Sequence, residues 1–115
     1  MSAHGNYQSV TIASGGTAST GIEATGTNRG SFQLPSAFTG VTVTVQVSNA
    51  NVATADLVPE ATWTNCPVEG NEVAAITAST DDALCLPVKS ANFRWLRLVS
   101  GSAEGAARTI LIWTP

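Results

Sequence analysis

The sequence predicts an all-β protein, a two-sheet antiparallel sandwich or jelly roll with about nine short strands. Three observations support this fold class. Apolar residues recur at every second position in several segments, as in strands with one buried face. Turn-forming residues separate these segments at intervals of about 8 to 12 positions. No segment shows helical periodicity over a useful length.

The clearest strand is predicted at residues 41–47, which read Val-Thr-Val-Thr-Val-Gln-Val. Side chains alternate between the two faces of a strand, so the four valines share one face and the polar residues share the other. Gly40 precedes the run, and Ser48 and Asn49 follow it. We therefore expect a half-buried strand with a dry valine face and a wet threonine face.

Residues 1–7 are small and polar, and they predict an extended N-terminal arm in front of a single domain over residues 8–115. The first three strands are expected over 8–13, 19–24 and 31–34. A Ser-Gly-Gly turn separates the first two, and a loop with two glycines separates the second from the third. Pro35 ends the third strand, because proline cannot donate to a β-ladder.

After the valine strand, residues 51–60 have no clear pattern and predict a loop or an irregular edge. Five more strands are expected over 61–66, 72–78, 83–86, 93–99 and 108–113. The segment 93–99 has apolar residues on both faces, which indicates a strand covered at least in part on both sides.

The predicted core consists of inward-pointing apolar residues from both sheets, which would pack about 10 Å apart. These residues are Phe32, Leu34, Val43, Val45, Leu84, Leu86, Leu96, Leu98, Ile110 and Ile112.

Charge is scarce in this chain of 115 residues, since 11% of them are charged against about 25% in typical proteins. The polar surface must therefore consist mainly of Ser, Thr, Asn and Gln, which suits a protein that packs against others or lies outside cells. The net charge is −3 and no basic cluster is present, so we expect no nucleic-acid partner.

The N-terminal segment has neither a positive region nor an apolar stretch of the signal-peptide kind. No apolar run approaches the roughly 20 residues of a membrane span. We expect a soluble protein that is made in a cytoplasm and does not bind membranes.

The two cysteines, Cys66 and Cys85, lack the spacing of metal ligands, and the chain has one histidine. We interpret them as small, partly buried apolar residues. The alternative is a disulfide between neighbouring strands, formed after release into an oxidising medium.

No catalytic constellation is recognisable. His4 lies in the predicted arm without a nearby cysteine or carboxylate. Asp81 and Asp82 fit a solvated turn better than a calcium site, which needs more oxygen ligands. The serines lack a nucleophile elbow and a base partner. We expect a protein that is not an enzyme and needs no cofactor or metal.

Charged residues on a covered strand face need partners. Arg94 and Arg97 fall on opposite faces of residues 93–99, and Arg108 heads the last strand. Packing of the arginine stem with pairing at the rim is favoured over contact with a partner's carboxylate. The candidate carboxylates within the chain are Glu60, Glu72 and Glu104.

Three blocks carry a resemblance to a known family: residues 34–48, residues 85–87, and residues 93–101 followed by 106–110. Their order and spacing resemble the small β-sandwich structural proteins of tailed bacteriophages, which serve as head decoration or cement proteins. The similarity covers residues 8–113. It implies a virion protein, made in the bacterial cytoplasm, that binds the major capsid protein on the capsid exterior as a homo-oligomer.

The aromatic residues of the chain suggest where such a protein would dock. If Trp95 lies opposite Leu96 and Leu98, it faces away from the core, where an exposed tryptophan is a good interface anchor. The residues expected to contact the capsid or other copies are His4, Asn6, Tyr7, Trp63, Trp95 and Arg97. The alternative function is a carbohydrate-binding module of a virion fibre or a secreted protein, which would present coplanar aromatic residues in a polar groove.

Overall fold

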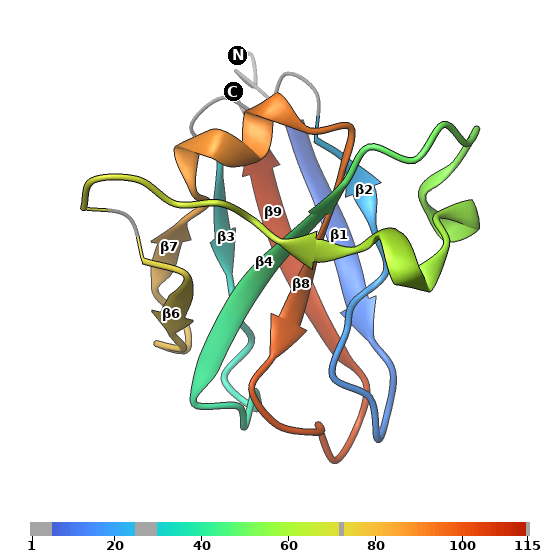
Figure 1. Ribbon diagram of the computed structural model, residues 1–115. Helices are drawn as coiled ribbons and strands as arrows, with labels where there is room; N and C mark the ends of the chain where they lie inside the picture. Colours follow the sequence, from blue (N-terminus) through green and yellow to red (C-terminus); the bar gives the residue numbers. More distant parts are fainter. Residues whose placement is uncertain (1–5, 25–29, 72, 115) are drawn as a thin grey trace.

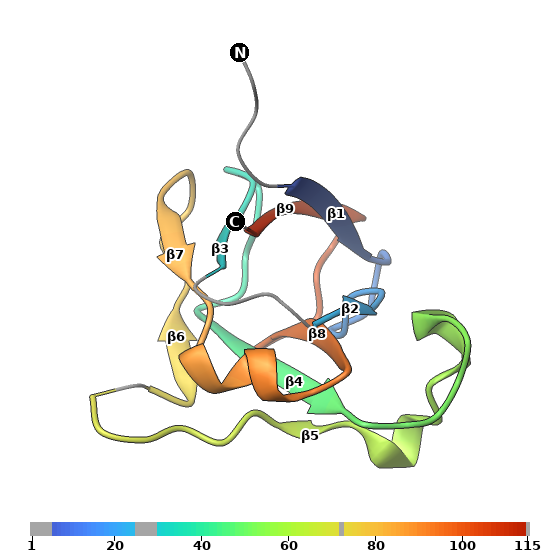
Figure 2. The ribbon, with the colours of Figure 1, turned by 90° about the horizontal axis from the view of Figure 1, so that it is seen from above.

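The computed structural model describes residues 6–24, 30–71 and 73–114 and shows two antiparallel β-sheets packed face to face (Figure 1). Viewed from above, the sheets form two layers, with β1 and β2 at one side of the sandwich and β6 and β7 at the other (Figure 2). The all-β sandwich predicted from the sequence is confirmed.

The first sheet has four strands in the order β1-β9-β3-β7. They are β1 (Asn6–Ile12), β9 (Arg108–Thr114), β3 (Ser31–Gln33) and β7 (Ala83–Cys85). The two longest strands of this sheet, β1 and β9, pair without interruption over seven residues each. We refer to this layer as the four-stranded sheet.

The second sheet has five strands, with β4 (Thr42–Ser48) at its centre. On one side of β4 lie β8 (Trp95–Ser100) and then β2 (Ile22–Glu23). On the other side, β5 (Thr64–Asn65) and β6 (Ala75–Thr77) pair with different parts of the same β4 edge. We refer to this layer as the five-stranded sheet.

The strand order identifies the jelly-roll form of the sandwich. If β5 and β6 are taken together as one interrupted strand, eight strands remain, and they are divided equally between the two sheets. The chain passes from one sheet to the other between β1, β2, β3 and β4, and again between β6, β7, β8 and β9. Such double-sheet, eight-strand connectivity is the arrangement of a jelly roll.

Three short 3₁₀ helices connect the strands: η1 (Ala55–Leu57), η2 (Glu60–Thr62) and η3 (Val88–Asn92). Pro59 and Pro87 precede η2 and η3, with φ angles of −61° and −57°. These values are the ones the proline ring imposes, so each proline fits the turn it introduces. In the described part of the chain, none of the helices is long and apolar enough to cross a membrane.

The core lies between the sheets, as the alternation of apolar residues predicts. All ten residues expected there belong to it, with Leu84 only partly buried at its margin. Further apolar side chains complete the core from both layers: Val10, Ile12, Ile22, Phe38 and Val47 are among them.

Several predicted boundaries are wrong. The strand expected over 61–66 is reduced to β5, because residues 60–62 form the 3₁₀ helix η2. Val41 does not share the dry face with the other valines, because β4 begins one residue later and the Val41 side chain is 78% exposed. At the N-terminus, β1 begins at Asn6, so the last two residues of the predicted arm belong to the sheet. Residues 1–5 of that arm lie outside the described residues.

Candidate functional site

The outer face of the four-stranded sheet carries no charged side chain at its strand positions. The pairing registers place every second residue of each strand on this face, away from the core. The ten residues are Tyr7, Ser9, Thr11, Ser31, Gln33, Ala83, Cys85, Thr109, Leu111 and Trp113. Hydroxyl, amide and apolar groups therefore make up the whole set.

An aromatic patch, defined here as Tyr7, Leu111 and Trp113, occupies one end of this outer face. Tyr7 lies directly opposite Trp113 in the register of β1 and β9. Tyr7 is 72% exposed and Leu111 is 49% exposed. The three patch residues also line a depression of about 270 Å³, together with Ser31 and Gln33. This arrangement offers apolar contact surface together with a few hydrogen-bonding groups, as protein interfaces do.

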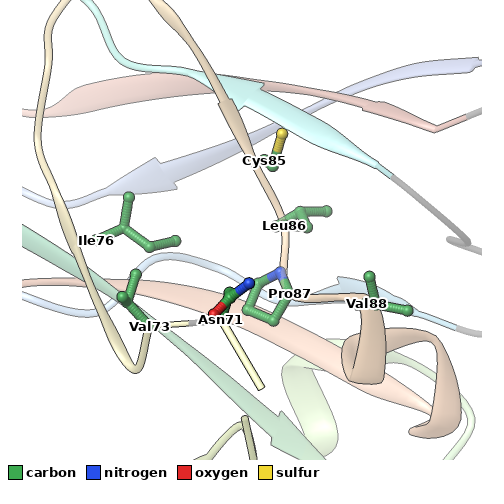
Figure 3. Close-up of a pocket in the computed structure, with 7 residues that line it drawn as sticks. All are labelled: Asn71, Val73, Ile76, Cys85, Leu86, Pro87 and Val88. Carbon is green, nitrogen blue, oxygen red and sulfur yellow. The ribbon is translucent and has the colours of Figure 1, made fainter. Parts of the chain in front are cut away.

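An apolar cleft opens on the β6 and β7 side of the sandwich and has a volume of about 320 Å³. Figure 3 shows Val73 and Ile76 along one wall, facing the chain that leads from β7 into η3. Val73 and Val88 are each 58% exposed at its margin. The lining is Asn71, Val73, Ile76, Cys85, Leu86, Pro87 and Val88. A small aliphatic group from a partner would fit its size and chemistry.

Trp95 is not an exposed anchor. Its side chain faces away from the core, as predicted, but it is only 4% exposed. The connection between β4 and β5 covers it, and the indole Nε1 donates a hydrogen bond of 3.0 Å to the Ala50 carbonyl oxygen. The backbone N–H of Arg94 donates to Asn49 Oδ1 of the same connection at 3.0 Å. Trp95 therefore fixes this connection to the sheet.

Arg97, also expected in the docking patch, is 8% exposed beneath the same connection. Its guanidinium donates two hydrogen bonds to the Glu60 carboxylate, at 2.9 and 2.5 Å, and its Nε donates to Gln46 Oε1 at 2.9 Å. The Trp63 ring stacks on it, with 4.7 Å from Arg97 Cζ to the ring centroid. Arg97 thus pairs within the chain, and Trp63 serves as part of its cover.

The Arg97 guanidinium also affects the acidity of its partner. Its hydrogen bonds to Glu60 lower the pKa of that carboxyl group, against a smaller opposing effect of burial, and its positive charge lowers the pKa further. The Glu60 side chain is 80% exposed, so solvent screens most of this attraction. Packing of the arginine and tryptophan is therefore the larger contribution to holding the connection in place.

We expect Arg97→Ala to lower the free energy of unfolding by about 2 to 3 kcal/mol, because it removes buried packing as well as hydrogen bonds. Glu60→Gln should have a clearly smaller effect, since its carboxylate is exposed. Urea denaturation followed by tryptophan fluorescence measures both. Equal losses for the two variants would show that the ion pair, and not the packing, holds the connection.

The remaining predicted contact residues divide into two groups. Tyr7 lies in the aromatic patch. His4 falls outside the described residues, and Asn6 is placed as the first residue of β1, without a description of its side chain. Leu111 and Trp113 were missed as contact candidates. The signal was present, since alternation in the last strand places them opposite Ile110 and Ile112, but nothing local showed that this face is open.

No disulfide joins the two cysteines. Cys66 is buried next to β5 of the five-stranded sheet, while Cys85 is exposed in β7 of the other sheet. The interpretation of Cys66 as a buried apolar residue is therefore confirmed, whereas Cys85 is at the surface.

No protein-family model, curated protein or solved structure matches this chain. The resemblance to phage decoration proteins stays a prediction from the sequence. Within the described residues, no group of three or more His, Cys, Asp or Glu side chains could hold a metal ion.

Proposed function

We propose that this protein binds the exterior of an assembled phage capsid and stabilises the shell as a decoration or cement protein, without catalysis. The observation that carries the proposal is the uncharged outer face of the four-stranded sheet with its exposed aromatic patch. The resemblance of the sequence to phage decoration proteins supports it independently. In this proposal the major capsid protein is the partner and the virion surface is the location.

The composition of the outer face determines the kind of binding expected. Because its strand positions carry no charge, contact with a capsid subunit requires no desolvation of ions. Apolar contacts and hydrogen bonds from hydroxyl and amide groups supply the affinity. Binding should therefore depend only weakly on salt, since screening acts on charges.

Stabilisation of the shell follows from selective binding. A protein that binds the assembled lattice but not free subunits shifts the equilibrium toward the lattice by mass action. Several linked contacts in an oligomer increase the overall affinity well beyond that of each contact. A modest patch such as Tyr7, Leu111 and Trp113 is then sufficient.

Leu111→Lys tests the outer face, because it places a charge on its central strand at a position that is already exposed. We expect at least a tenfold loss of affinity for undecorated heads, about 1.4 kcal/mol per contact, with thermal stability nearly unchanged. Val41→Lys is the matched control, since Val41 is exposed immediately before β4 of the other sheet. Co-sedimentation with heads at low and high salt gives the affinities.

Unchanged head binding by Leu111→Lys would contradict the assignment of this face. Strong salt dependence in the wild-type protein would contradict the proposed uncharged contact.

A carbohydrate-binding module is the second candidate, and the opposed pair Tyr7 and Trp113 favours it. Aromatic faces contact the apolar faces of sugars, and Ser31 and Gln33, which line the same depression, could bind hydroxyl groups. Jelly rolls occur in viral structural proteins and in lectins, so the fold favours neither function. Binding to a soluble glycan panel, without binding to heads, would decide for this candidate.

A further inference from the structure

Strand β1 is an unusual edge strand. It forms one margin of the four-stranded sheet and is seven residues long (Figure 2). The other strands that border the sheets in the described part of the chain, β2, β5, β6 and β7, have only two or three residues each. Short edge strands are one way in which proteins prevent pairing with other chains. Only β1 lacks this protection.

The sequence of β1 also lacks the other protective features. Its residues are Asn-Tyr-Gln-Ser-Val-Thr-Ile, without a charge or a proline. Its register with β9 is continuous over all seven residues, so no bulge twists the edge away. Tyr7, Gln8 and Ser9 are consecutive and all exposed, although their side chains alternate between the two faces. The first half of this edge is therefore open.

The hydrogen bonds of Thr11 show which backbone groups point outward. Its N–H donates to Thr20 Oγ1 at 3.1 Å and its carbonyl oxygen accepts from the Thr20 N–H at 3.0 Å, so both point away from β9. Backbone direction alternates along an antiparallel strand, so the groups of Tyr7 and Ser9 also point outward. Among the described residues these groups have no partner. They form a free pairing edge.

We infer that this edge pairs, antiparallel, with β1 of a second copy of the chain across a two-fold axis. The two four-stranded sheets would then join into one continuous sheet. This interface goes beyond shell binding, because it would form between free copies in solution. We assign a second copy as the partner because the open backbone donors and acceptors of one β1 edge match those of another β1 edge in antiparallel register.

The register is restricted by Thr11, whose outward groups are already used. Centring the pair on Ser9 would place Tyr7 opposite Thr11. The outward N–H and carbonyl oxygen of Tyr7 would then have no partner, because those of Thr11 are already bonded to Thr20. Centring it on Gln8 places Tyr7 of each copy opposite Ser9 of the other, so the open groups satisfy one another in two hydrogen-bonded pairs. The Gln8 residues of the two copies then lie opposite each other on the two-fold axis, and because glutamine is uncharged they do not repel each other.

This pairing would also extend the candidate binding face. Tyr7 and Ser9 lie on the outer face, so the outer faces of both copies would form one uncharged surface. The two aromatic patches would lie close to the axis, because Tyr7 belongs to both the patch and the edge. The dimer would thus present two docking patches in a fixed arrangement.

Cross-linking at the axis tests the register. Gln8→Cys, in a Cys85→Ser background, should form a disulfide-linked dimer on mild oxidation, because opposed residues of a non-hydrogen-bonded pair have Cα atoms about 4.5 Å apart, within disulfide range. Thr109→Cys in the same background is the control, since Thr109 is also exposed but lies on the interior strand β9. Equal cross-linking of the two variants, or none at Gln8→Cys, would overturn the proposal.

Solution measurements provide a second test that does not depend on cysteines. In sedimentation equilibrium, the wild-type protein should dimerise, and Ser9→Pro, which removes an outward donor at a position where an edge strand tolerates proline, should dimerise at least about tenfold more weakly. Amide exchange of Tyr7 and Ser9 should slow as the concentration rises, while that of Gln8 and Val10 should not change. A wild-type protein that stays monomeric, with these amides protected only on heads, would assign the edge to a capsid strand and overturn the proposal.

Discussion

Val45→Asp is expected to abolish folding or to lower the free energy of unfolding by more than about 3 kcal/mol. Val45 is 1% exposed in the middle of β4 and faces the space between the sheets. The residue paired with Val45 on the neighbouring strand β8 is Leu98, which is completely buried. A carboxylate at this position would have no partner and no access to water. Urea denaturation followed by circular dichroism measures the loss.

Thr44→Asp is the matched control, one residue earlier on the same strand. Thr44 is half-buried on the outer face, opposite Val99 of β8 and Ala75 of β6. A carboxylate there can reach solvent, so we expect a cost of about 1 kcal/mol. Equal destabilisation by the two substitutions would mean that both faces of β4 are buried in solution.

The alternation around β4 was predictable because strand periodicity is a local property. The alternation of Val43, Val45 and Val47 with polar residues predicts the buried face of the strand without any information on neighbouring strands. The end of the strand is different, since it depends on where the partner strands stop. Val41 continues the pattern perfectly, yet it lies beyond β4, where its carbonyl oxygen accepts a hydrogen bond from the Ala78 N–H. That contact joins distant segments, which the local pattern does not reveal.

In the candidate site, too, the features that follow from local alternation were predictable and those that depend on distant segments were not. The orientation of Trp95 away from Leu98 follows from alternation, but its burial depends on the connection between β4 and β5, a stretch without a sequence pattern. The outer face of the four-stranded sheet combines strands from both ends and the middle of the chain. Its uncharged character appears only after Tyr7 is placed opposite Trp113.

Glu104 was one of three carboxylates considered as arginine partners, and the structure shows it in a larger role. It is 1% exposed in the connection between β8 and β9. Its Oε1 accepts from the Thr39 N–H and hydroxyl at 2.9 and 3.1 Å and from Arg108 Nε at 2.9 Å. Its Oε2 accepts from the Gly40 N–H at 2.9 Å and from the Ser100 hydroxyl at 3.0 Å. One side chain thus fastens the connection before β4 to the one before β9.

Glycine at position 40 is required by this close approach. A Cβ atom there would collide with the Ser100 hydroxyl oxygen, so the chain reaches the carboxylate only without a side chain. The sequence marked Gly40 only as the residue in front of the valine strand, and it did not reveal the carboxylate that the Gly40 N–H contacts.

Glu104→Ala is expected to lower the free energy of unfolding by about 3 to 5 kcal/mol, because it leaves Arg108 and the backbone N–H groups of Thr39 and Gly40 without their acceptor. Glu104→Gln should cost less, but still more than about 1 kcal/mol, since its amide NH₂ group meets donors where an acceptor is needed. Glu23→Gln is the control, because Glu23 is exposed on β2. A loss for Glu104→Gln no larger than for this control would contradict the assigned role.

The stability that Glu104 supplies should disappear in acid. Burial alone would raise the pKa of its carboxyl group, but the hydrogen bonds from Thr39, Arg108 and Ser100 outweigh burial and lower the pKa from 4.5 to about 2. The unfolded chain therefore takes up this proton at a higher pH than the folded one, and the contribution is complete above about pH 4.5 and falls as the pH approaches 2. The Tm difference between wild type and Glu104→Gln should accordingly be largest near pH 7 and shrink from about pH 4.5 downward. Thermal unfolding of both proteins across this range measures it, and a difference that stays constant down to pH 2.5 would show that Glu104 does not keep its charge through these hydrogen bonds.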